Sequence, residues 1–170
     1  MQPWRKLREG VVYERYRRVT SRTFELPTGE IADYEVIDLL DTAIVLALAG
    51  GDVLLVRQFR PGPEELLLEL PGGVIEPGRE PIEVAAAELL EETGYRGNLA
   101  PTGTIMKDAY ATNAKHLFLA TDCTKVAEPE HPELSEPVLV SLDEFRAQLR
   151  SGRLADTDCG YRGLEALGLL

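Results

Sequence analysis

Alternation of apolar and polar residues dominates the first half of the chain and predicts that it begins with strands. Successive side chains of a strand point to opposite faces, so a period of two residues, or a short run that is almost wholly apolar, indicates a strand. Residues 27–29 and 50–52 separate such runs with Pro and Gly, as hairpin turns do. The predicted strands are 11–19, 21–26, 30–40, 42–49, 52–60 and 65–73.

A helical period replaces this alternation between residues 81 and 93. Pro81 suits the first turn of a helix, and Gly94 suits the position directly after its end. Residues three and four apart share one face of a helix. The core-facing stripe predicted on this basis consists of Ile82, Ala86, Leu89, Leu90 and Thr93.

The remainder of the chain returns to strands and closes with helices. The predicted elements are strands at 99–106, 116–120 and 135–142, a helix beginning at 142, and a short last helix within 156–170. Strands around one central helix, with further helices at the carboxyl end, predict an α/β sandwich. The chain has 170 residues, of which 44% are hydrophobic, enough for a substantial core.

Charge and cysteine content limit which molecules the protein is expected to bind and in which compartment it is expected to be found. The chain carries 18 Lys and Arg against 29 Asp and Glu, a formal net charge of −11. This excess of acid argues against nucleic acid as a partner, and a phosphate-rich substrate needs local basic residues or metal. The longest apolar run, 43–49, is too short to span a bilayer. Cys123 and Cys159 lack metal-type spacing and are expected to be free thiols of a cytoplasmic protein.

Three glutamates near the end of the predicted helix are the main candidate chemistry. Glu88, Glu91 and Glu92 share one face, where they repel one another unless a cation lies between them. Ligation by oxygen alone favours Mg²⁺ or Mn²⁺ over zinc. Such a metal can orient a diphosphate and lower the pKa of an attacking water. For glutamates alone, the alternative is a solvated acidic face.

The segment GGVIEPGREPIEVAAAELLEETGY, residues 72–95, resembles the Nudix box, G-x5-E-x7-R-E-U-x-E-E-x-G-U, where U is aliphatic or aromatic. The match begins at Gly73. Two positions depart from the pattern, because Arg79 stands in place of the first Glu and Ala87 in place of the Arg. The positions that match are Glu88, Leu89, Glu91, Glu92, Gly94 and Tyr95.

The resemblance extends beyond the box to most of the chain. LLVRQFRPGPEELLLELPGG, the opening WRKLREGVVYERYRRV and the late VSLDEFRAQLRSGRL resemble the ADP-ribose pyrophosphatase branch. This branch implies a Nudix-type α/β/α sandwich with mixed β-sheets, a central Nudix helix and an N-terminal antiparallel β-region. It also implies that residues 1–40 form a dimerisation region of a homodimer, and that 41–170 form the hydrolase domain.

The resemblance assigns roles to the box and to a later loop. Metal is expected on the backbone carbonyl of Gly72 and on Glu88 and Glu92, with Glu91 as a further ligand or as an anchor of the helix face. A glutamate from the loop before the late strand is expected to act as base or as an extra ligand. The candidates are Glu133 and Glu136, with Glu128 and Glu130 behind them.

Basic and aromatic residues are the candidates for substrate binding. Arg57 matches an arginine that meets substrate in the resembled branch, and Arg60 is the second candidate. A guanidinium binds two phosphate oxygens at once, although a salt bridge at the sheet edge is an equal alternative for Arg57. Trp4 and Tyr16 are expected to offer a platform for the nucleobase, and Tyr13 and Tyr110 are the other available rings; ordinary packing is the alternative for each.

The function expected on this basis is metal-dependent hydrolysis of a nucleoside diphosphate derivative. The first candidate substrate is ADP-ribose, which would give AMP and ribose 5-phosphate. A non-catalytic or weakly active nucleotide-binding domain is the alternative that Arg79 and Ala87 keep open. Another nucleotide sugar or a dinucleoside polyphosphate is the alternative substrate. Because all three glutamates are retained, the enzyme is favoured.

Overall fold

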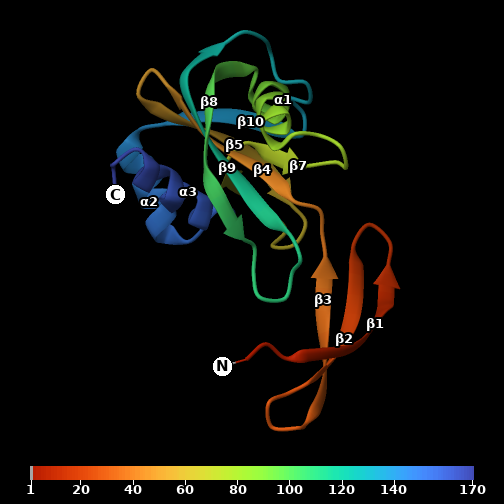
Figure 1. Cartoon of the computed structure of the whole chain (residues 1–170). Helices are drawn as coiled ribbons and strands as arrows, with labels where there is room; N and C mark the ends of the chain where they lie inside the picture. Colours follow the sequence, from red (N-terminus) through yellow and green to blue (C-terminus); the bar gives the residue numbers. More distant parts are fainter. Residues whose placement is uncertain (1) are drawn as a thin grey trace. The chain divides into compact units, whose positions relative to one another are not determined.

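A computed structural model describes residues 2–170 and divides the chain into two compact units (Figure 1). The smaller unit consists of Met1–Leu40 together with Met106–Ala114. The larger unit consists of Asp41–Ile105 and Lys115–Leu170. Within the described residues, no helix is long and apolar enough to cross a membrane.

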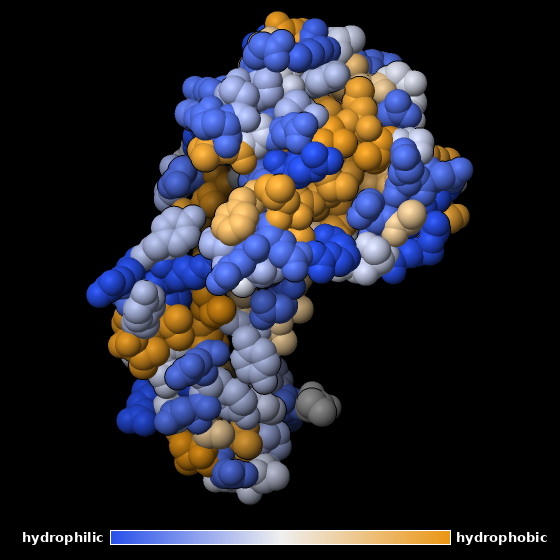
Figure 2. All heavy atoms as spheres, turned by 180° about the vertical axis from the view of Figure 1, so that it is seen from behind, coloured by the Kyte–Doolittle hydropathy of each residue, from blue (hydrophilic) through white to orange (hydrophobic). Residues whose placement is uncertain are grey.

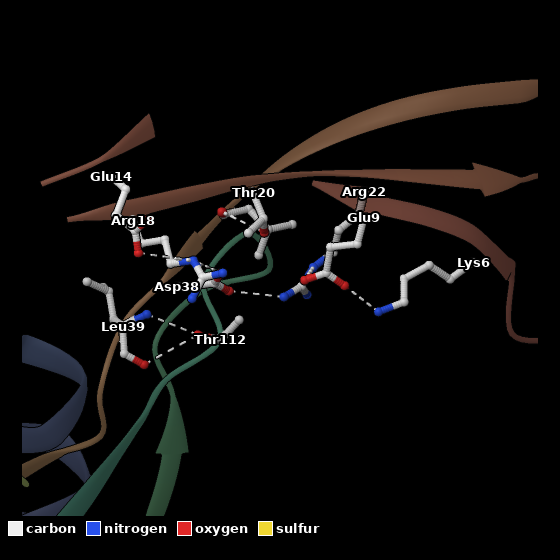
Figure 3. Close-up of polar contacts among 10 residues, drawn as sticks. Lys6, Glu9, Glu14, Arg18, Thr20, Arg22, Asp38, Leu39 and Thr112 are labelled. Carbon is white, nitrogen blue, oxygen red and sulfur yellow. Dashed lines mark hydrogen bonds and ion pairs between the residues drawn. The ribbon is translucent and has the colours of Figure 1, made fainter. Parts of the chain in front are cut away.

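The smaller unit is an antiparallel sheet in the order β1-β2-β3. Its strands are β1 (Arg5–Glu14), β2 (Arg18–Glu25) and β3 (Ile31–Asp38). The outer edge of β3 is covered by the segment around Tyr110, since Ile37 N–H donates to the Tyr110 carbonyl (2.8 Å) and Thr112 N–H donates to the Ile37 carbonyl (3.0 Å). The Thr112 hydroxyl accepts from Leu39 N–H (3.0 Å), as Figure 3 shows. These bonds make a distant piece of chain part of this unit.

Charged residues on neighbouring strands of this sheet pair across it (Figure 3). Arg22 lies between Glu9 (3.4 Å) and Asp38 (3.0 Å). Arg18 of β2 lies 3.8 Å from Asp38 of β3, and within β1 Lys6 also reaches Glu9. Opposite charges on neighbouring strands each contribute a few tenths of a kcal/mol, about 0.2–1, and help to fix the register.

The larger unit is built on a seven-stranded sheet in the order β10-β5-β4-β9-β8, with β6 paired to β5 and β7 paired to β4. β4 and β9 run parallel, whereas β5 is antiparallel to β4, β6 and β10. The strands are β4 (Thr42–Ala49), β5 (Asp52–Arg60), β6 (Glu65–Glu69), β7 (Gly72–Val74), β8 (Tyr95–Met106), β9 (Ala114–Lys125) and β10 (Ser135–Val140). The helices are α1 (Pro81–Thr93), α2 (Leu142–Ser151) and α3 (Thr157–Ala166).

Helices cover both faces of this sheet, which gives the three layers of a sandwich. Along β4, Val45 belongs to a buried cluster with Val84 and Leu89 of α1. The next residue, Leu46, belongs to a second cluster with Phe145 of α2 and Leu164 of α3. Because neighbouring strand residues point to opposite faces, one apolar strand serves two cores. The same alternation decides which polar side chains at the end of β5 face α1.

The elements agree with the predicted fold class, with differences at particular places. β4, β5 and α1 have the predicted bounds. The predicted strand at 11–19 was wrong, because the chain turns between Glu14 and Arg18 at residues that include neither Gly nor Pro. The predicted strand at 65–73 is divided into β6 and β7.

The predicted core stripe of α1 was partly wrong. The buried residues of α1 are Val84, Ala85, Leu89 and Thr93. Leu89 and Thr93 belong to the predicted stripe, whereas Val84 and Ala85 do not. Ile82, which was assigned to the stripe, is 42% exposed. The buried face of α1 is therefore rotated from the one predicted, toward positions 84, 85 and 89.

Candidate metal and substrate site

The helix that carries the glutamates is fixed at both ends. Pro81 occupies the first turn, where no intrahelical N–H partner is needed. At the other end Gly94 adopts a left-handed conformation (φ 75°) and its N–H donates to the Leu90 carbonyl. A Cβ at Gly94 would also overlap the backbone of Ala127. Glycine is therefore required here both by the dihedral angle and by the close approach of the loop.

The loop between β9 and β10 is bonded to the carboxyl end of α1. Val126 N–H donates to the Gly94 carbonyl (2.8 Å), and Glu130 N–H donates to the Glu91 carbonyl (2.8 Å). These bonds satisfy carbonyls that a helix end leaves without intrahelical partners. They also bring the acidic loop predicted to hold a base next to the helix with the metal candidates.

Glu88 lies against strand β7. A Cβ on Gly73 would overlap the Glu88 carboxylate, so the absence of a side chain at this position creates the space that the carboxylate fills. Burial raises the pKa of Glu88, and the nearby negative charge of Glu91 raises it further. The positive charge of Arg79 acts in the opposite direction and lowers it. Glu88 is thus held where negative charge is unfavourable without a cation.

Glu92 lies between β5 and the loop before β7. Its Oε1 accepts from Gln58 Nε2 (2.6 Å), and its Oε2 accepts from Gly72 N–H (3.0 Å). Burial raises the pKa of Glu92 to about 7, and the charge of Glu88 adds to this effect. The bonds from Gly72 and Gln58 favour the ionised form and lower the pKa. Two neighbouring box carboxylates therefore share one partly desolvated region.

Of the two candidate arginines, Arg60 is the one whose charge acts on Glu92. Its guanidinium donates through Nε to Glu69 Oε1 (2.5 Å) and through Nη2 to Glu69 Oε2. Its positive charge lowers the pKa of Glu92. Glu69 is 5% exposed, whereas Arg60 is exposed, so one side of the guanidinium is fixed and the rest remains accessible.

Arg57 lies on the other face of the sheet. Leu54 packs in the cluster with α1 and Leu55 in the cluster with α2 and α3. Strand alternation then places Gln58 and Arg60 on the α1 face and Arg57 on the opposite face. There Arg57 Nη1 lies 2.9 Å from Glu136 Oε2, its cross-strand neighbour on β10. The structure thus brings Arg57 and Glu136 together and separates both from the side of the sheet that faces Glu92.

The remaining acidic candidates lie in the loop before β10. Glu133 is exposed, with its Oε1 3.5 Å from His131 Nδ1. Glu128 pairs with Lys125 at 2.9 Å. Glu130 is anchored through its backbone at Glu91. The side chains of Glu130 and Glu133 have no lysine or arginine partner among the salt bridges of the described chain.

The two departures from the box occupy different surroundings. Arg79 is exposed, and its positive charge acts on Glu88. Ala87 lines a groove of about 390 Å³ between α1 and β8, with Leu90 and Arg96 among its other lining residues. Position 87, which carries Arg in the family pattern, therefore lines a largely apolar groove, to which Arg96 contributes an arginine.

The donor set fits a hard divalent cation. Glu88, Glu91 and Glu92 supply carboxylate oxygens only, which are the ligands that Mg²⁺ and Mn²⁺ prefer. The raised pKa values of Glu88 and Glu92 indicate negative charge that the protein does not neutralise. In residues 2–170 these three carboxylates do not all approach within 4.8 Å of one another.

A second group of possible ligands lies elsewhere in the larger unit, at the start of α3. Oxygen and sulfur atoms of Asp156, Asp158 and Cys159 lie within 4.8 Å of one another. Lys115 Nζ occupies this position, at 3.3 Å from Asp156 and 2.9 Å from Asp158. Its side chain is 13% exposed, so the ammonium already supplies the positive charge that a metal would bring. We interpret this group as a structural ion pair.

The aromatic candidates belong to the smaller unit. The Trp4 ring lies 5.5 Å from that of Tyr34 and 6.2 Å from that of Phe24. These rings line a cavity of about 550 Å³, to which Arg22 and Tyr110 also contribute. Tyr16 is 94% exposed in the β1–β2 turn, and it does not line this cavity. The structure thus places Trp4 in an aromatic cluster and Tyr16 outside it.

Two residues of this region had not been predicted. Gln58 contacts Glu92, and Glu69 holds Arg60. The available signal was the alternation along β5, which places Gln58 and Arg60 on one face, two residues apart. Their partners come from other elements, so local sequence alone did not identify these contacts.

Comparison with known proteins connects this geometry to a family. The family model described as NUDIX domain matches residues 38–157. The ADP-ribose pyrophosphatase of Bacillus subtilis (strain 168) is 30% identical over 143 residues, 81% of this chain and 77% of that protein. The CMP-5'-(N-acetyl-N-hydroxy-3-aminopropyl)phosphonate hydrolase of Streptomyces rubellomurinus is 31% identical over 171 residues, 98% of this chain and 83% of that protein.

A solved structure extends the likeness to the fold. The crystal structure of an ADP compounds hydrolase has a TM-score of 0.84 and 21% identity, with 100% of this chain and 98% of that chain covered. The predicted sandwich and the predicted assignment to a hydrolase that cleaves diphosphates are confirmed. Because the family model matches more than half of the residues, the chain belongs to the Nudix domain family.

Proposed function

We propose that this protein hydrolyses ADP-ribose to AMP and ribose 5-phosphate with Mg²⁺ or Mn²⁺. The observation that carries the proposal is the position of Glu92, partly desolvated between Gln58 and Gly72, with Glu88 beside it and Arg60 nearby. Carboxylates and one arginine are the groups needed to hold a metal and a diphosphate together. The similarity to an ADP-ribose pyrophosphatase supports the choice of substrate.

Each residue has a defined task in this reaction. Glu88, Glu92 and the Gly72 carbonyl hold the metal, with Glu91 as a further ligand. When bound, the metal neutralises diphosphate charge and lowers the pKa of the attacking water. Arg60 binds phosphate oxygens with the part of its guanidinium that Glu69 leaves accessible. Arg57 remains a weaker candidate because it faces the other side of the sheet.

The general base belongs to the loop before β10 or to the start of that strand. Glu133 and Glu136 were the two leading candidates from the sequence. We favour Glu133, because its carboxylate is exposed, whereas Glu136 is paired with Arg57. Glu133 takes one proton from water as the oxygen attacks phosphorus, and the bond to the bridging oxygen breaks to release the two monophosphates.

The aromatic cavity of the smaller unit is our candidate for the nucleobase. Trp4 offers a ring face beside Tyr34, and flat apolar surfaces of this kind stack with a base. The cavity of about 550 Å³ falls within the range of small-molecule sites, roughly 300–1,000 Å³. Tyr16 is retained as a second candidate that could contact substrate only outside this cavity.

We further propose that the protein is a homodimer of the cytoplasm. Every residue of β1 is exposed, including Leu7, Val11, Val12 and Tyr13. Figure 2 shows apolar side chains gathered among polar ones on the surface of both units. An exposed edge strand with apolar side chains is suited to contact with a second copy. The two cysteines, Cys123 and Cys159, are buried free thiols, as in proteins of reducing compartments.

A CMP-linked substrate is the second candidate. The similarity to the CMP-linked phosphonate hydrolase covers 98% of this chain, more than the similarity to the ADP-ribose enzyme covers. A domain that binds nucleotides without turnover is the remaining alternative, since Arg79 and Ala87 depart from the box. Both alternatives use the same glutamate helix, so substrate and turnover must be measured.

The deciding experiment is a product assay on a panel of nucleotides. ADP-ribose, a CMP-linked phosphonate, a dinucleoside polyphosphate and other nucleotide sugars are incubated with protein in Mg²⁺, in Mn²⁺ and in chelator. We expect metal-dependent release of AMP from ADP-ribose, abolished by E92Q and retained by E83Q, a matched change at an exposed position of the same helix. Nucleotide binding without turnover of any compound would refute the hydrolase, and turnover unchanged in E92Q would refute the site.

A further inference from the structure

Glu92 differs from the other box glutamates in the hydrogen bonds that its carboxylate accepts. Gln58 Nε2 donates to one oxygen (2.6 Å) and Gly72 N–H donates to the other (3.0 Å). Among the side-chain hydrogen bonds of the described residues, no donor to the carboxylates of Glu88 or Glu91 is present. The carboxylate of Glu92 is therefore the one whose direction the protein fixes in advance.

The donor on Gln58 is held in a part of β5 that has a neighbouring strand on each side. Gln58 pairs with Ser135 of β10 on one side and with Leu67 of β6 on the other. A strand between two neighbours has little freedom to shift. Strand alternation directs Gln58 toward the face that α1 covers, where Glu92 lies. The distance of 2.6 Å thus joins a helix residue to a rigid point of the sheet.

Two bonds leave the carboxylate able to bind metal. An ionised carboxylate has about four lone-pair positions, and Gln58 and Gly72 occupy two of them. The remaining two positions lie in a plane that these donors determine. Without Gln58, only the bond from Gly72 would restrain rotation of the carboxylate about its last side-chain bond. Fixing a ligand before the metal arrives reduces the ordering cost of binding.

We propose that Gln58 is a positioning residue, which orients the carboxylate of Glu92 for the divalent cation without touching substrate or metal. This inference rests on the proposed function, because it assumes that Glu92 is a metal ligand. Partners of this kind typically change metal affinity or activity by about 10–100-fold when removed. The effect is expected on the affinity for metal, since Gln58 is not assigned a contact with the nucleotide.

The experiment measures binding of Mn²⁺ alone, by electron paramagnetic resonance, in the absence of nucleotide. Q58M keeps the length of the side chain and removes the donor, whereas Q58N keeps an amide but withdraws it by one methylene. We expect both variants to bind Mn²⁺ roughly 10-fold or more weakly. Q148M is the matched control, because Gln148 lies on α2 on the other face of the sheet. Its Mn²⁺ affinity is expected to equal that of the wild type.

A double-mutant cycle with E92A distinguishes positioning from general damage. In the E92A background, Q58M is expected to have no further effect on Mn²⁺ affinity, since the carboxylate that it orients is gone. An equal loss from Q58M in both backgrounds would overturn the proposal, and so would wild-type Mn²⁺ affinity in folded Q58M and Q58N. If E92A itself binds Mn²⁺ normally, the metal assignment fails instead, which separates the two failures.

Kinetics provide a second readout that a merely structural role would not move. With ADP-ribose as substrate, Q58M should need more Mn²⁺ for half-maximal rate, by the same factor as its loss of affinity. At saturating Mn²⁺ its KM should remain that of the wild type. A raised KM at saturating metal would assign Gln58 to substrate and contradict a role in positioning Glu92.

Discussion

The carboxylate of Glu88 occupies the space that a side chain at Gly73 would fill. The backbone of Gly73 does not have a positive φ, so alanine fits its conformation and only the added methyl group conflicts. G73A should therefore displace the Glu88 carboxylate, and we expect Mn²⁺ affinity to fall by roughly 10-fold. The atoms in conflict are the far end of a flexible side chain, so the free energy of unfolding should fall by no more than about 1 kcal/mol.

Mn²⁺ titration and urea unfolding measure these two effects of G73A. The matched control is G62A, because a Cβ at Gly62 has no neighbour within 4 Å and its φ is also not positive. We expect G62A to retain its metal affinity. Equal affinities of G73A and the wild type would show that the contact between Gly73 and Glu88 is unimportant for the metal.

The raised pKa of Glu92 predicts how the metal-free protein responds to pH. Burial holds the pKa of Glu92 at about 7 in the folded protein, above its ordinary value of 4.5. Between these pH values the folded protein binds more protons than the unfolded chain, so the free energy of unfolding falls as pH rises. The loss for this group is at most on the order of 3 kcal/mol.

Urea unfolding in chelator, across the interval between the ordinary and the raised pKa of Glu92, measures this effect. The glutamine of E92Q cannot ionise. This variant should therefore lose the part of the pH dependence of the free energy of unfolding that Glu92 contributes. Glu88 and Asp156 also have a raised pKa and act in the same direction, so some slope should remain. The same slope in E92Q and in the wild type would contradict the prediction.

The two arginines of β5 should differ in their effect on substrate binding. Arg60 shares the α1 face with Gln58, whereas Arg57 pairs with Glu136 on the other face. We expect R60M to raise the KM for ADP-ribose by about 10–100-fold, since a charged hydrogen-bonding partner is worth about 1.5–3 kcal/mol. R57M should change KM much less. A larger effect for R57M would favour the original ranking from the sequence.

Loss of Arg60 also leaves the buried carboxylate of Glu69 without its hydrogen-bond partner, which should lower the free energy of unfolding by about 1–3 kcal/mol. The double variant R60M/E69M separates stability from binding, because it removes both charges. We expect its free energy of unfolding to recover toward the wild type while its KM stays high. Recovery of KM together with stability would show that Arg60 acts only through the fold.

The charge at position 79 should affect metal binding. Arg79 lowers the pKa of Glu88, so its positive charge also opposes a cation bound there. R79E is expected to strengthen Mn²⁺ binding a few-fold at low salt, and the gain should shrink at high salt because Arg79 is exposed. R15E, in the β1–β2 turn, makes the same change in net charge and should have no such effect. Weaker Mn²⁺ binding by R79E would contradict the expected sign.

The elements predicted most accurately are those whose ends carry specific signals. α1 begins at Pro81 and ends before Gly94, and a Gly-Gly turn separates β4 from β5, so these bounds followed from local chemistry. The turn between β1 and β2 has no such signal and was missed. Where Pro or Gly stands at the end of an element, the local sequence determines its bounds. The position of the β1–β2 turn depends instead on how the two strands pair.

The site was predicted only as far as one helix determines it. Glu88, Glu91 and Glu92 are brought together by helical spacing, which the sequence reveals. Gln58 lies 34 residues before Glu92, and their contact depends on where α1 lies on the sheet. The difference between Arg57 and Arg60 depends likewise on which face of β5 the helix covers. Local patterns do not contain that information.

The segment Met106–Ala114 belongs to the same compact unit as the first forty residues, although the whole of 41–105 separates them in the chain. A shortened protein that begins at Asp41 would therefore still contain part of the smaller unit. It would leave Tyr110 and Thr112 without the strand to which their backbones are bonded. The amino-terminal sheet of this protein therefore cannot be removed by a cut at the terminus alone, because the β8–β9 connection must change with it.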